Sequence, residues 1–269
     1  MNLISQILQK KRQKSTCALI PFITAGYPSL ETTLKALYTL DQKGADIIEL
    51  GIPYSDALAD GPIIQESSKV ALQQGVYIDQ VFNLLSQINP KLTAPIVIFT
   101  YYNPVLVRGI DRFIKEISYL GVKGLIIPDL PIEETDYLNY LCSKYNIELI
   151  LFIAPTSSMD RITSILSKAP GCIYLVSGTG VTGIRKNVNY EISRLSSYIK
   201  SKTDKLVMLG FGISNSSQVS QISQWDIDGL VIGSAFVRIL SNEVDSDDVS
   251  YLGSFCSQMK DSIVIKKTI

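Results

Sequence analysis

The feature of this sequence that most constrains its fold is an alternation of eight short apolar runs with helix-length segments. The apolar runs have the length and the β-branched content of buried parallel strands. Most of them begin some 23 to 33 residues apart, which is the spacing of units made of one strand and one helix. We therefore expect strands at 18–24, 46–50, 96–101, 124–128, 149–154, 172–176, 206–210 and 230–233.

Helices are expected between these strands and before the first one. The N-terminal residues, M-N-L-I-S-Q-I-L-Q-K-K-R, predict a short amphipathic helix. The interval after the second strand is longer than the others, with room for a loop at 53–60 and an additional helix at 64–72. The remaining helices are expected at 31–43, 111–120, 133–144, 160–168, 190–200 and 216–224.

This pattern predicts an α/β protein that folds as one (β/α)8 TIM barrel. No linker rich in proline, glycine or serine divides the chain, so residues 1–269 are expected to form a single domain. The N-terminal helix and the extra helix after the second strand are additions to the barrel. The alternative is a doubly wound open sheet, which would usually carry a G-x-G-x-x-G turn after its first strand; the chain has T-A-G-Y-P at 24–28 instead.

Composition excludes several classes of function. The chain contains no histidine, which rules out Ser-His-Asp and Cys-His catalysis and histidine-ligated metal sites. The net charge is zero and no basic stretch is interleaved with aromatic residues, so nucleic acid is not an expected partner. The apolar runs are too short to span a membrane. Four scattered cysteines without a C-x-x-C pair, and the lack of a signal-peptide apolar region, indicate a reducing compartment.

Two acids near the end of the second strand are the candidate catalytic residues. Glu49 lies inside an apolar run, where an unpaired carboxylate would cost several kcal/mol to bury. Asp60 lies on the following loop, which could fold over Glu49. This arrangement suits general acid–base chemistry on a small substrate. The alternative is structural, since acids at strand ends and in loops often form hydrogen bonds or cap turns.

Glycine-rich segments follow the last three predicted strands and favour a phosphate site. They are S-G-T-G-V-T-G at 177–183, G-F-G-I-S at 210–214 and I-G-S-A-F-V at 232–237. Backbone N–H groups can approach an anion closely at glycines, and Ser234 could cap a short helix that faces the anion. The alternative is that these glycines only form tight turns. Phosphate groups in TIM barrels usually bind at the loops after strands seven and eight.

Other strand ends contribute side chains suited to a flat apolar ring in the substrate. The residues at these strand ends are Phe22, Tyr101, Tyr102, Asp129, Ile153 and Tyr174, and the aromatic and aliphatic side chains among them are those that would suit the ring. Most of these residues could instead belong to the upper part of the core, and this is the default interpretation for Ile153.

Several motifs together resemble those of the tryptophan synthase alpha subunit family. They are P-F-I-T-A-G-Y-P at 21–28, E-L-G-I-P-Y-S-D-x-L-A-D-G-P-x-I-Q at 49–65, Asn103-Pro104, P-D-L-P-x-E-E at 128–134, G-V-T-G at 180–183 and G-F-G-I-S at 210–214. The resemblance extends over essentially the whole chain. It implies a (β/α)8 barrel that cleaves indole-3-glycerol phosphate to indole and glyceraldehyde 3-phosphate.

The resemblance also implies roles for particular residues. The catalytic glutamate and aspartate of the family match Glu49 and Asp60. The substrate-binding residues implied are Phe22, Tyr101, Ile153, Tyr174, Thr182, Gly183, Phe211, Gly212, Gly233 and Ser234. Two departures are present: Ala57 stands where many members have proline, and Gly178 where some have arginine. Both lie in loops beside the expected site, so they put the mobility of these loops in doubt and leave the chemistry intact.

Family membership would also imply a partner. A beta subunit that carries pyridoxal phosphate would dock near Asp56, Asn103 and Pro104, receive indole through a tunnel and form an alpha2beta2 tetramer. No cofactor and no metal are expected in this chain itself. The expected compartment is the bacterial cytoplasm, or the plastid stroma if the chain is plastid-encoded.

The chemistry deduced from the residues agrees with this resemblance. A retro-aldol cleavage needs an electron sink, and indole becomes its own sink once C3 is protonated. Glu49 can then move protons to C3 and from the side-chain hydroxyl, while Asp60 stabilises charge at the ring N–H. Two alternatives stay open: another phosphate-binding barrel enzyme, such as an isomerase or a lyase that works alone, and a catalytically silent barrel that activates a partner.

Overall fold

The computed structural model describes residues 1–88, 91–176, 190–210, 212–242 and 248–266. Eight parallel strands follow one another around a closed barrel, and β8 pairs with β1 to close it. The strands are β1 Ala18–Thr24, β2 Ile48–Gly51, β3 Ile96–Phe99, β4 Gly124–Ile126, β5 Glu148–Ile153, β6 Cys172–Val176, β7 Leu206–Gly210 and β8 Gly229–Ile232. The fold is therefore the predicted (β/α)8 TIM barrel.

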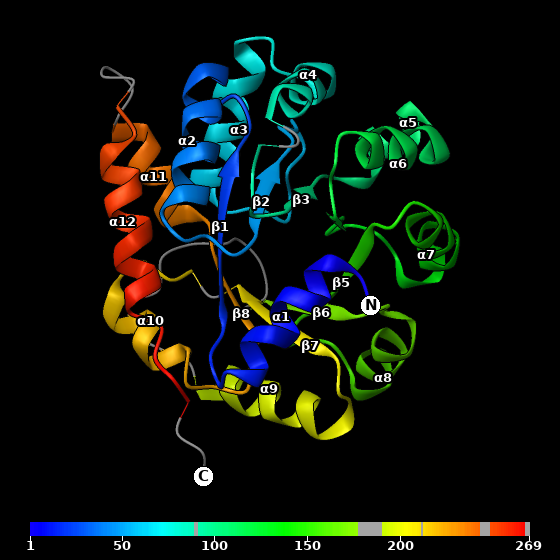
Figure 1. Cartoon of the computed structure of the whole chain (residues 1–269). Coiled ribbons are helices and arrows are strands. Elements are labelled where there is room, and N and C mark those ends of the chain that lie inside the picture. Colours follow the sequence, from blue (N-terminus) through cyan, green and yellow to red (C-terminus); the bar gives the residue numbers. More distant parts are fainter. Residues whose placement is uncertain (89–90, 177–189, 211, 243–247, 267–269) are drawn as a thin grey trace.

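Helices surround the strands, and α1 lies against the barrel apart from this outer ring (Figure 1). The helices are α1 Leu3–Gln13, α2 Leu30–Gln42, α3 Pro62–Gln73, α4 Ile78–Ile88, α5 Tyr102–Arg108, α6 Ile110–Tyr119, η1 Ile132–Glu134, α7 Thr135–Lys144, α8 Met159–Lys168, α9 Tyr190–Lys202, α10 Ser216–Ile222, α11 Ser234–Asn242 and α12 Ser250–Asp261. Within the described ranges, none of these helices combines the length and the apolarity needed to cross a membrane.

The structure adds helices that the sequence pattern did not predict. The interval between β2 and β3 contains α4 as well as the expected α3. Helix α5 begins immediately after the third strand, in a segment where Pro104 argues against a helix interior. In α5 this proline lies in the first turn, where its missing N–H has no helical partner to lose. The C-terminal α12 is rich in serine and was also not predicted.

The hydrophobic core has two layers because strand side chains alternate between the two faces of the barrel wall. One layer fills the barrel interior with side chains such as those of Ile20, Val97 and Met208. The other layer lies between the strands and the outer helices. Helix α1 contributes Ile4 and Leu8 to the interior layer, so it covers the end of the barrel at which the strands begin.

Buried acids at that end of the barrel are fully bonded. Glu148 accepts hydrogen bonds from the Ser5 hydroxyl at 2.5 Å and from the Cys172 N–H at 2.7 Å. Asp228 accepts two hydrogen bonds from Arg12, both at 2.9 Å, and forms an ion pair with Lys200 at 2.5 Å. These bonds tie α1 and α9 to the strands and supply partners for buried charges.

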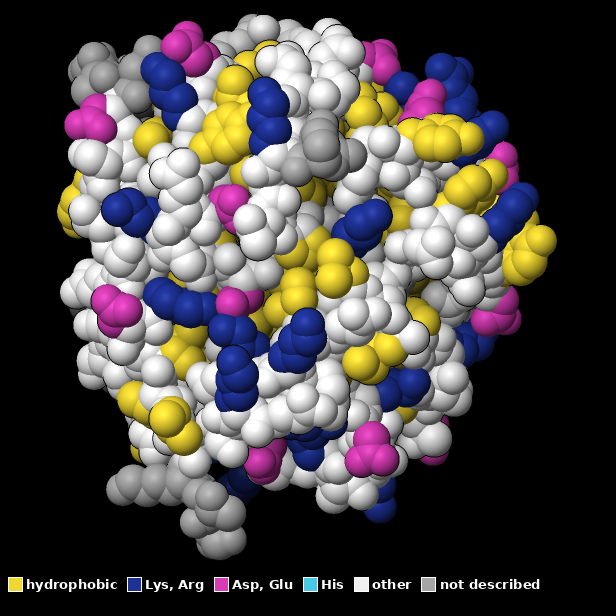
Figure 2. All heavy atoms as spheres, in the orientation of Figure 1, with side chains coloured by type: hydrophobic (Ala, Val, Ile, Leu, Met, Phe, Trp, Pro, Cys, Tyr) yellow, Lys and Arg dark blue, Asp and Glu magenta, His cyan; other side chains and the backbone are white. Residues whose placement is uncertain are grey.

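Basic side chains gather on the outside of this same region. Lys10, Lys11 and Arg12 lie in the last turn of α1, and Lys200 and Lys202 lie in the last turn of α9. Figure 2 shows Lys and Arg side chains grouped over this part of the surface. Cations are favoured there because the carboxyl end of a helix carries a partial negative charge.

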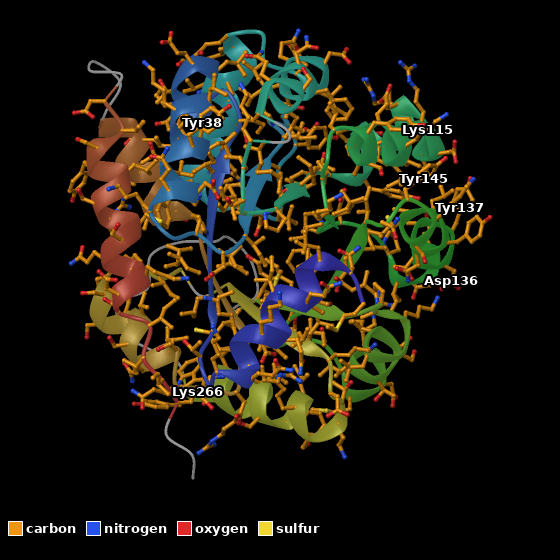
Figure 3. The ribbon with its side chains drawn as sticks, viewed as in Figure 1. Tyr38, Lys115, Asp136, Tyr137, Tyr145 and Lys266 are labelled. Atoms are coloured by element: carbon orange, nitrogen blue, oxygen red, sulfur yellow. The ribbon has the colours of Figure 1, made fainter. Side chains whose placement is uncertain are left out.

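The C-terminal segment closes over the same end of the barrel. The Lys266 N–H donates to the Ser15 carbonyl at 2.6 Å, and its side chain bonds to the Ile227 carbonyl. On the opposite flank, Asp136 and Tyr137 of α7 point away from the barrel (Figure 3). Through Lys266, the C-terminal segment thus contacts the loops that precede β1 and β8.

Asp228→Asn should destabilise the fold. Burial alone would raise the pKa of Asp228, but Arg12 and Lys200 together lower it below the ordinary value. The stabilisation is therefore present above the pKa of an unfolded aspartate and is lost as the pH falls through the lower folded pKa. We expect the variant to lose about 3 kcal/mol of unfolding free energy at pH 7.

Urea denaturation at pH values from 7 to 3 checks this expectation. The difference between wild type and variant should narrow below about pH 4. Glu66→Gln serves as the control, because Glu66 is exposed and lies 3.8 Å from Lys69. Equal stability of Asp228→Asn and wild type at pH 7 would contradict the role of this ion pair.

Candidate active site

Glu49 lies within β2 with its side chain in the barrel interior. It is 1% exposed and stands in register with Phe22 of β1 and Val97 of β3. Its Oε2 atom is buried and has no hydrogen-bond partner among the described residues. Burial, and then the charge of Asp60, raise the pKa of Glu49 to about 8. Near neutral pH this carboxyl can therefore both donate and accept a proton.

Asp60 lies at the end of the loop that follows β2 and is also buried, at 5% exposure. The Tyr101 hydroxyl donates a hydrogen bond to its Oδ2 at 3.0 Å and accepts one from the Ala59 N–H at 3.0 Å. Burial raises the pKa of Asp60 to about 6, although the hydrogen bond from Tyr101 lowers it. Asp60 therefore ionises before Glu49, and the two neighbouring acids can take different roles.

Aromatic rings form the wall of the barrel mouth. Phe22 and Phe99 meet edge to face with ring centroids 5.7 Å apart, and Phe99 meets Tyr101 in the same way at 6.2 Å. Tyr174 lies 4.7 Å from Phe152, measured between ring centroids. The burial of Tyr174 and the nearby charges of Glu49 and Asp60 raise the pKa of its hydroxyl. A flat apolar ring would fit among these side chains.

Two glycines make room for this wall. A Cβ atom on Gly51 would lie 2.7 Å from the Phe22 ring, and one on Gly210 would lie 2.6 Å from the Tyr174 hydroxyl. Any side chain at either position would displace an aromatic ring. The glycines at these strand ends therefore serve close packing of the wall.

The position of Ile153 agrees with its default interpretation as a core residue. Its side chain is fully buried in the layer between the strands and the helices, so it does not face the barrel mouth. The preceding residue, Phe152, packs against the interior layer and contacts Tyr174. Tyr102 likewise lies in the helix-facing layer, where its hydroxyl donates to Glu134. Neighbouring residues of a strand take opposite faces, so Phe152, which the sequence analysis did not single out, lies on the interior side while Ile153 lies on the helix side. A contact of Ile153 with substrate stays a prediction.

The predicted phosphate residues are only partly described. Gly233 lies between β8 and α11, and Ser234 is the first residue of this nine-residue helix. Gly212 follows β7 with a φ of +63°. Thr182, Gly183 and Phe211 lie outside the described residues. A Cβ atom on Gly233 would lie 3.5 Å from the Phe22 side chain, so the amino end of α11 lies near the aromatic wall. Its first N–H groups, which have no acceptor within the helix, could bind an anion there.

The predicted partner-binding residues lie on the surface. Asp56 is exposed in the loop that carries Asp60, and Asn103 is exposed in the first turn of α5. Pro104 is half-buried beside Asn103. The Asn103 amide donates to the Tyr54 hydroxyl at 3.4 Å, which links the two segments. Three exposed apolar side chains lie in the same segments: Leu58 at 85%, Leu106 at 47% and Val107 at 80%.

Comparison with known proteins identifies the family. The family model described as tryptophan synthase alpha chain matches residues 8–264. The chain belongs to the tryptophan synthase alpha chain family. Its relative from Gracilaria tenuistipitata var. liui is 61% identical over 98% of this chain and 97% of the relative. The relative from Synechocystis sp. is 45% identical over 98% of this chain and 100% of the relative.

Solved structures agree with this membership. A solved structure of Mycobacterium tuberculosis tryptophan synthase superposes with a TM-score of 0.90 at 29% identity, covering 99% of both chains. Tryptophan synthase subunit alpha from Legionella pneumophila superposes with a TM-score of 0.88 at 31% identity, covering 97% of this chain and 98% of that one. A tryptophan synthase alpha chain acts in tryptophan biosynthesis, and the lyase class expected from the sequence is that of this family.

The site consists of acids, aromatic rings and backbone groups. In the described part of the chain, no group of three or more cysteine, aspartate and glutamate side chains could hold a metal ion. Glu49 and Asp60 are the acids that the structure brings together beneath the aromatic wall.

Glu49→Gln should make the folded chain more stable in alkaline solution. The folded pKa of Glu49 is raised to about 8, so the wild type loses stability as the pH rises from the unfolded pKa towards 8. A neutral glutamine does not titrate. We expect the variant to exceed the wild type by about 3 kcal/mol of unfolding free energy at pH 8 and by much less at pH 5. Urea denaturation at the two pH values measures this, and a variant less stable than the wild type at pH 8 would disprove it.

Proposed function

We propose that this chain cleaves indole-3-glycerol phosphate to indole and glyceraldehyde 3-phosphate, as the alpha subunit of a tryptophan synthase. The observation that carries the proposal is the pair of buried acids with separated pKa values, about 8 for Glu49 and about 6 for Asp60. An acid that is still protonated and a neighbour that is already ionised are what this cleavage requires.

The two acids would act at different atoms of the substrate. Glu49, protonated at neutral pH, donates its proton to C3 of the indole ring. The ionised Asp60 stabilises the positive charge that then develops at the ring N–H. Glu49, now a carboxylate, takes the proton of the side-chain hydroxyl as the bond between C3 and the side chain breaks. The bond electrons restore the aromatic indole and the hydroxyl carbon becomes the aldehyde, so the proton balance closes on Glu49.

Different parts of the barrel mouth would bind the two ends of this substrate, the indole ring and the phosphate. Phe22, Tyr101, Phe152 and Tyr174 would contact the indole ring. Gly183, Gly212, Gly233 and Ser234 would contact the phosphate chiefly through backbone N–H groups, and Thr182 and Phe211 would also bind substrate. The apolar ring and the anion would thereby orient the scissile bond over Glu49.

The partner of the chain would be a tryptophan synthase beta subunit that carries pyridoxal phosphate. It would dock on the segments of Asp56, Asn103 and Pro104, form an alpha2beta2 tetramer and receive indole directly. The exposed Leu58, Leu106 and Val107 support this choice of face, because grouped exposed apolar side chains mark interaction surfaces. The relatives come from red algae and cyanobacteria, which supports a plastid or a bacterial cytoplasm as the compartment.

Loss of the Glu49 carboxyl should abolish the cleavage without preventing binding. Glu49→Gln should bind indole-propanol phosphate normally and lose about 10³- to 10⁴-fold in kcat, the upper part of the range for acid–base catalysis, because one group moves two protons. Indole release from indole-3-glycerol phosphate is the measurement, with beta subunit present. More than a few per cent of wild-type activity would exclude Glu49 as the proton carrier.

The beta subunit should raise the rate of the isolated chain. If docking favours the catalytic position of the Asp60 loop, kcat for indole release should rise at least about tenfold, or about 1.4 kcal/mol, during a titration with the cognate beta subunit. By linkage, indole-propanol phosphate should tighten beta-subunit binding. A chain that works at full rate alone and ignores the beta subunit would instead be a stand-alone lyase.

A further inference from the structure

The side chain of Gln65 reaches from α3 back to the loop that carries Asp60. Its Nε2 atom donates hydrogen bonds to the carbonyl oxygens of Ala57, at 3.1 Å, and Asp60, at 3.0 Å. Both partners are acceptors, so only the nitrogen of the amide can face them. One side chain therefore uses both of its N–H groups to join the middle of the loop to its end.

Tyr101 bonds the same loop from the barrel side. Its hydroxyl accepts a hydrogen bond from the Ala59 N–H and donates one to the Asp60 carboxyl. Within the loop, the Asp60 N–H donates to the Ala57 carbonyl at 3.1 Å. The backbone is thus bonded by Gln65 and the carboxyl by Tyr101, through separate contacts.

Helix α3 is itself attached to the barrel near Gln65. The Thr24 hydroxyl at the end of β1 and the Ser67 hydroxyl of α3 lie 2.6 Å apart, and both side chains are buried. Ser67 also donates to the Ile64 carbonyl at 2.8 Å. Because Gln65 lies between Ile64 and Ser67, its position is determined by the barrel wall.

We propose that Gln65 is a positioning residue for Asp60, acting through the loop backbone. It does not bond the Asp60 carboxyl, so its contribution is to the placement of that group over the substrate ring. Its loss should lower kcat, which depends on the carboxyl position, and change KM little, since KM depends on the ring and phosphate contacts. The inference rests on the proposed lyase function.

Gln65→Glu tests the proposal with little change in shape. An ionised glutamate offers no donor and would face two carbonyl oxygens. We expect kcat for indole release to fall about tenfold or more, with KM within about threefold of wild type. Gln65→Asn keeps the amide on a shorter side chain that can reach only one carbonyl. Its kcat should therefore lie between those of the wild type and of Gln65→Glu.

Limited proteolysis supplies a readout that does not depend on catalysis. Leu58 is 85% exposed in the loop, and a loop released from Gln65 should be cut by chymotrypsin several times faster there. Gln74→Glu is the matched control, since Gln74 caps the same helix and donates to the Pro28 carbonyl at 2.7 Å, away from the Asp60 loop. The control variant should keep the wild-type kcat and the wild-type rate of digestion by chymotrypsin.

The outcomes separate this proposal from the proposed function. The role of Gln65 would be overturned if a folded Gln65→Glu variant had the wild-type kcat and was cut by chymotrypsin at the wild-type rate. Equal loss of kcat in Gln65→Glu and Gln74→Glu would also overturn it, because the effect would then belong to α3 as a whole. A wild-type chain that releases no indole, with or without beta subunit, would refute the proposed function. The rates of chymotrypsin digestion would still show whether Gln65 holds the Asp60 loop in place.

Discussion

Glu49 can lie inside the barrel only in a form that the apolar surroundings tolerate, since an unpaired carboxylate is costly to transfer from water. Phe22 and Val97 stand beside it in register, and its Oε2 atom has no partner in the described structure. The protonated form is therefore favoured up to about pH 8. This one burial makes the residue useful as an acid at neutral pH, and it also makes the strand end a weak point of the fold.

The opposite end of the barrel also contains buried acids, but those acids have partners. There, Asp228 and Glu148 are buried with complete sets of partners, and α1 covers the interior with Ile4 and Leu8. Ion pairs with good geometry stabilise a buried charge, whereas an unpaired acid destabilises the fold. The division agrees with the general design of TIM barrels, in which one end maintains the fold and the other carries the chemistry.

Periodicity alone predicted the barrel, because a buried parallel strand is a short local signal. The predicted bounds of β1, β6 and β7 agree with the structure, and α3 was expected near its observed place. Helices α4 and α12 were not predicted, because their sequences were not distinguished from those of the neighbouring loops. Phe152 of β5 was not singled out either: it packs against the interior layer, whereas Ile153 lies in the layer that faces the helices. When a strand is apolar on both faces, its sequence does not reveal which residues face the barrel interior and which face the helices.

The sequence by itself determined the fold class and the family and singled out the two acids, because each rests on local patterns, namely short apolar runs and short motifs, that can be recognised one at a time along the chain. Only the tertiary structure decided what those acids are like. The pKa values of Glu49 and Asp60 depend on burial by distant strands, and the place of Asp60 depends on Tyr101, 41 residues further along the chain. Desolvation and hydrogen bonding act through space, so they exist only once the barrel has closed around these groups.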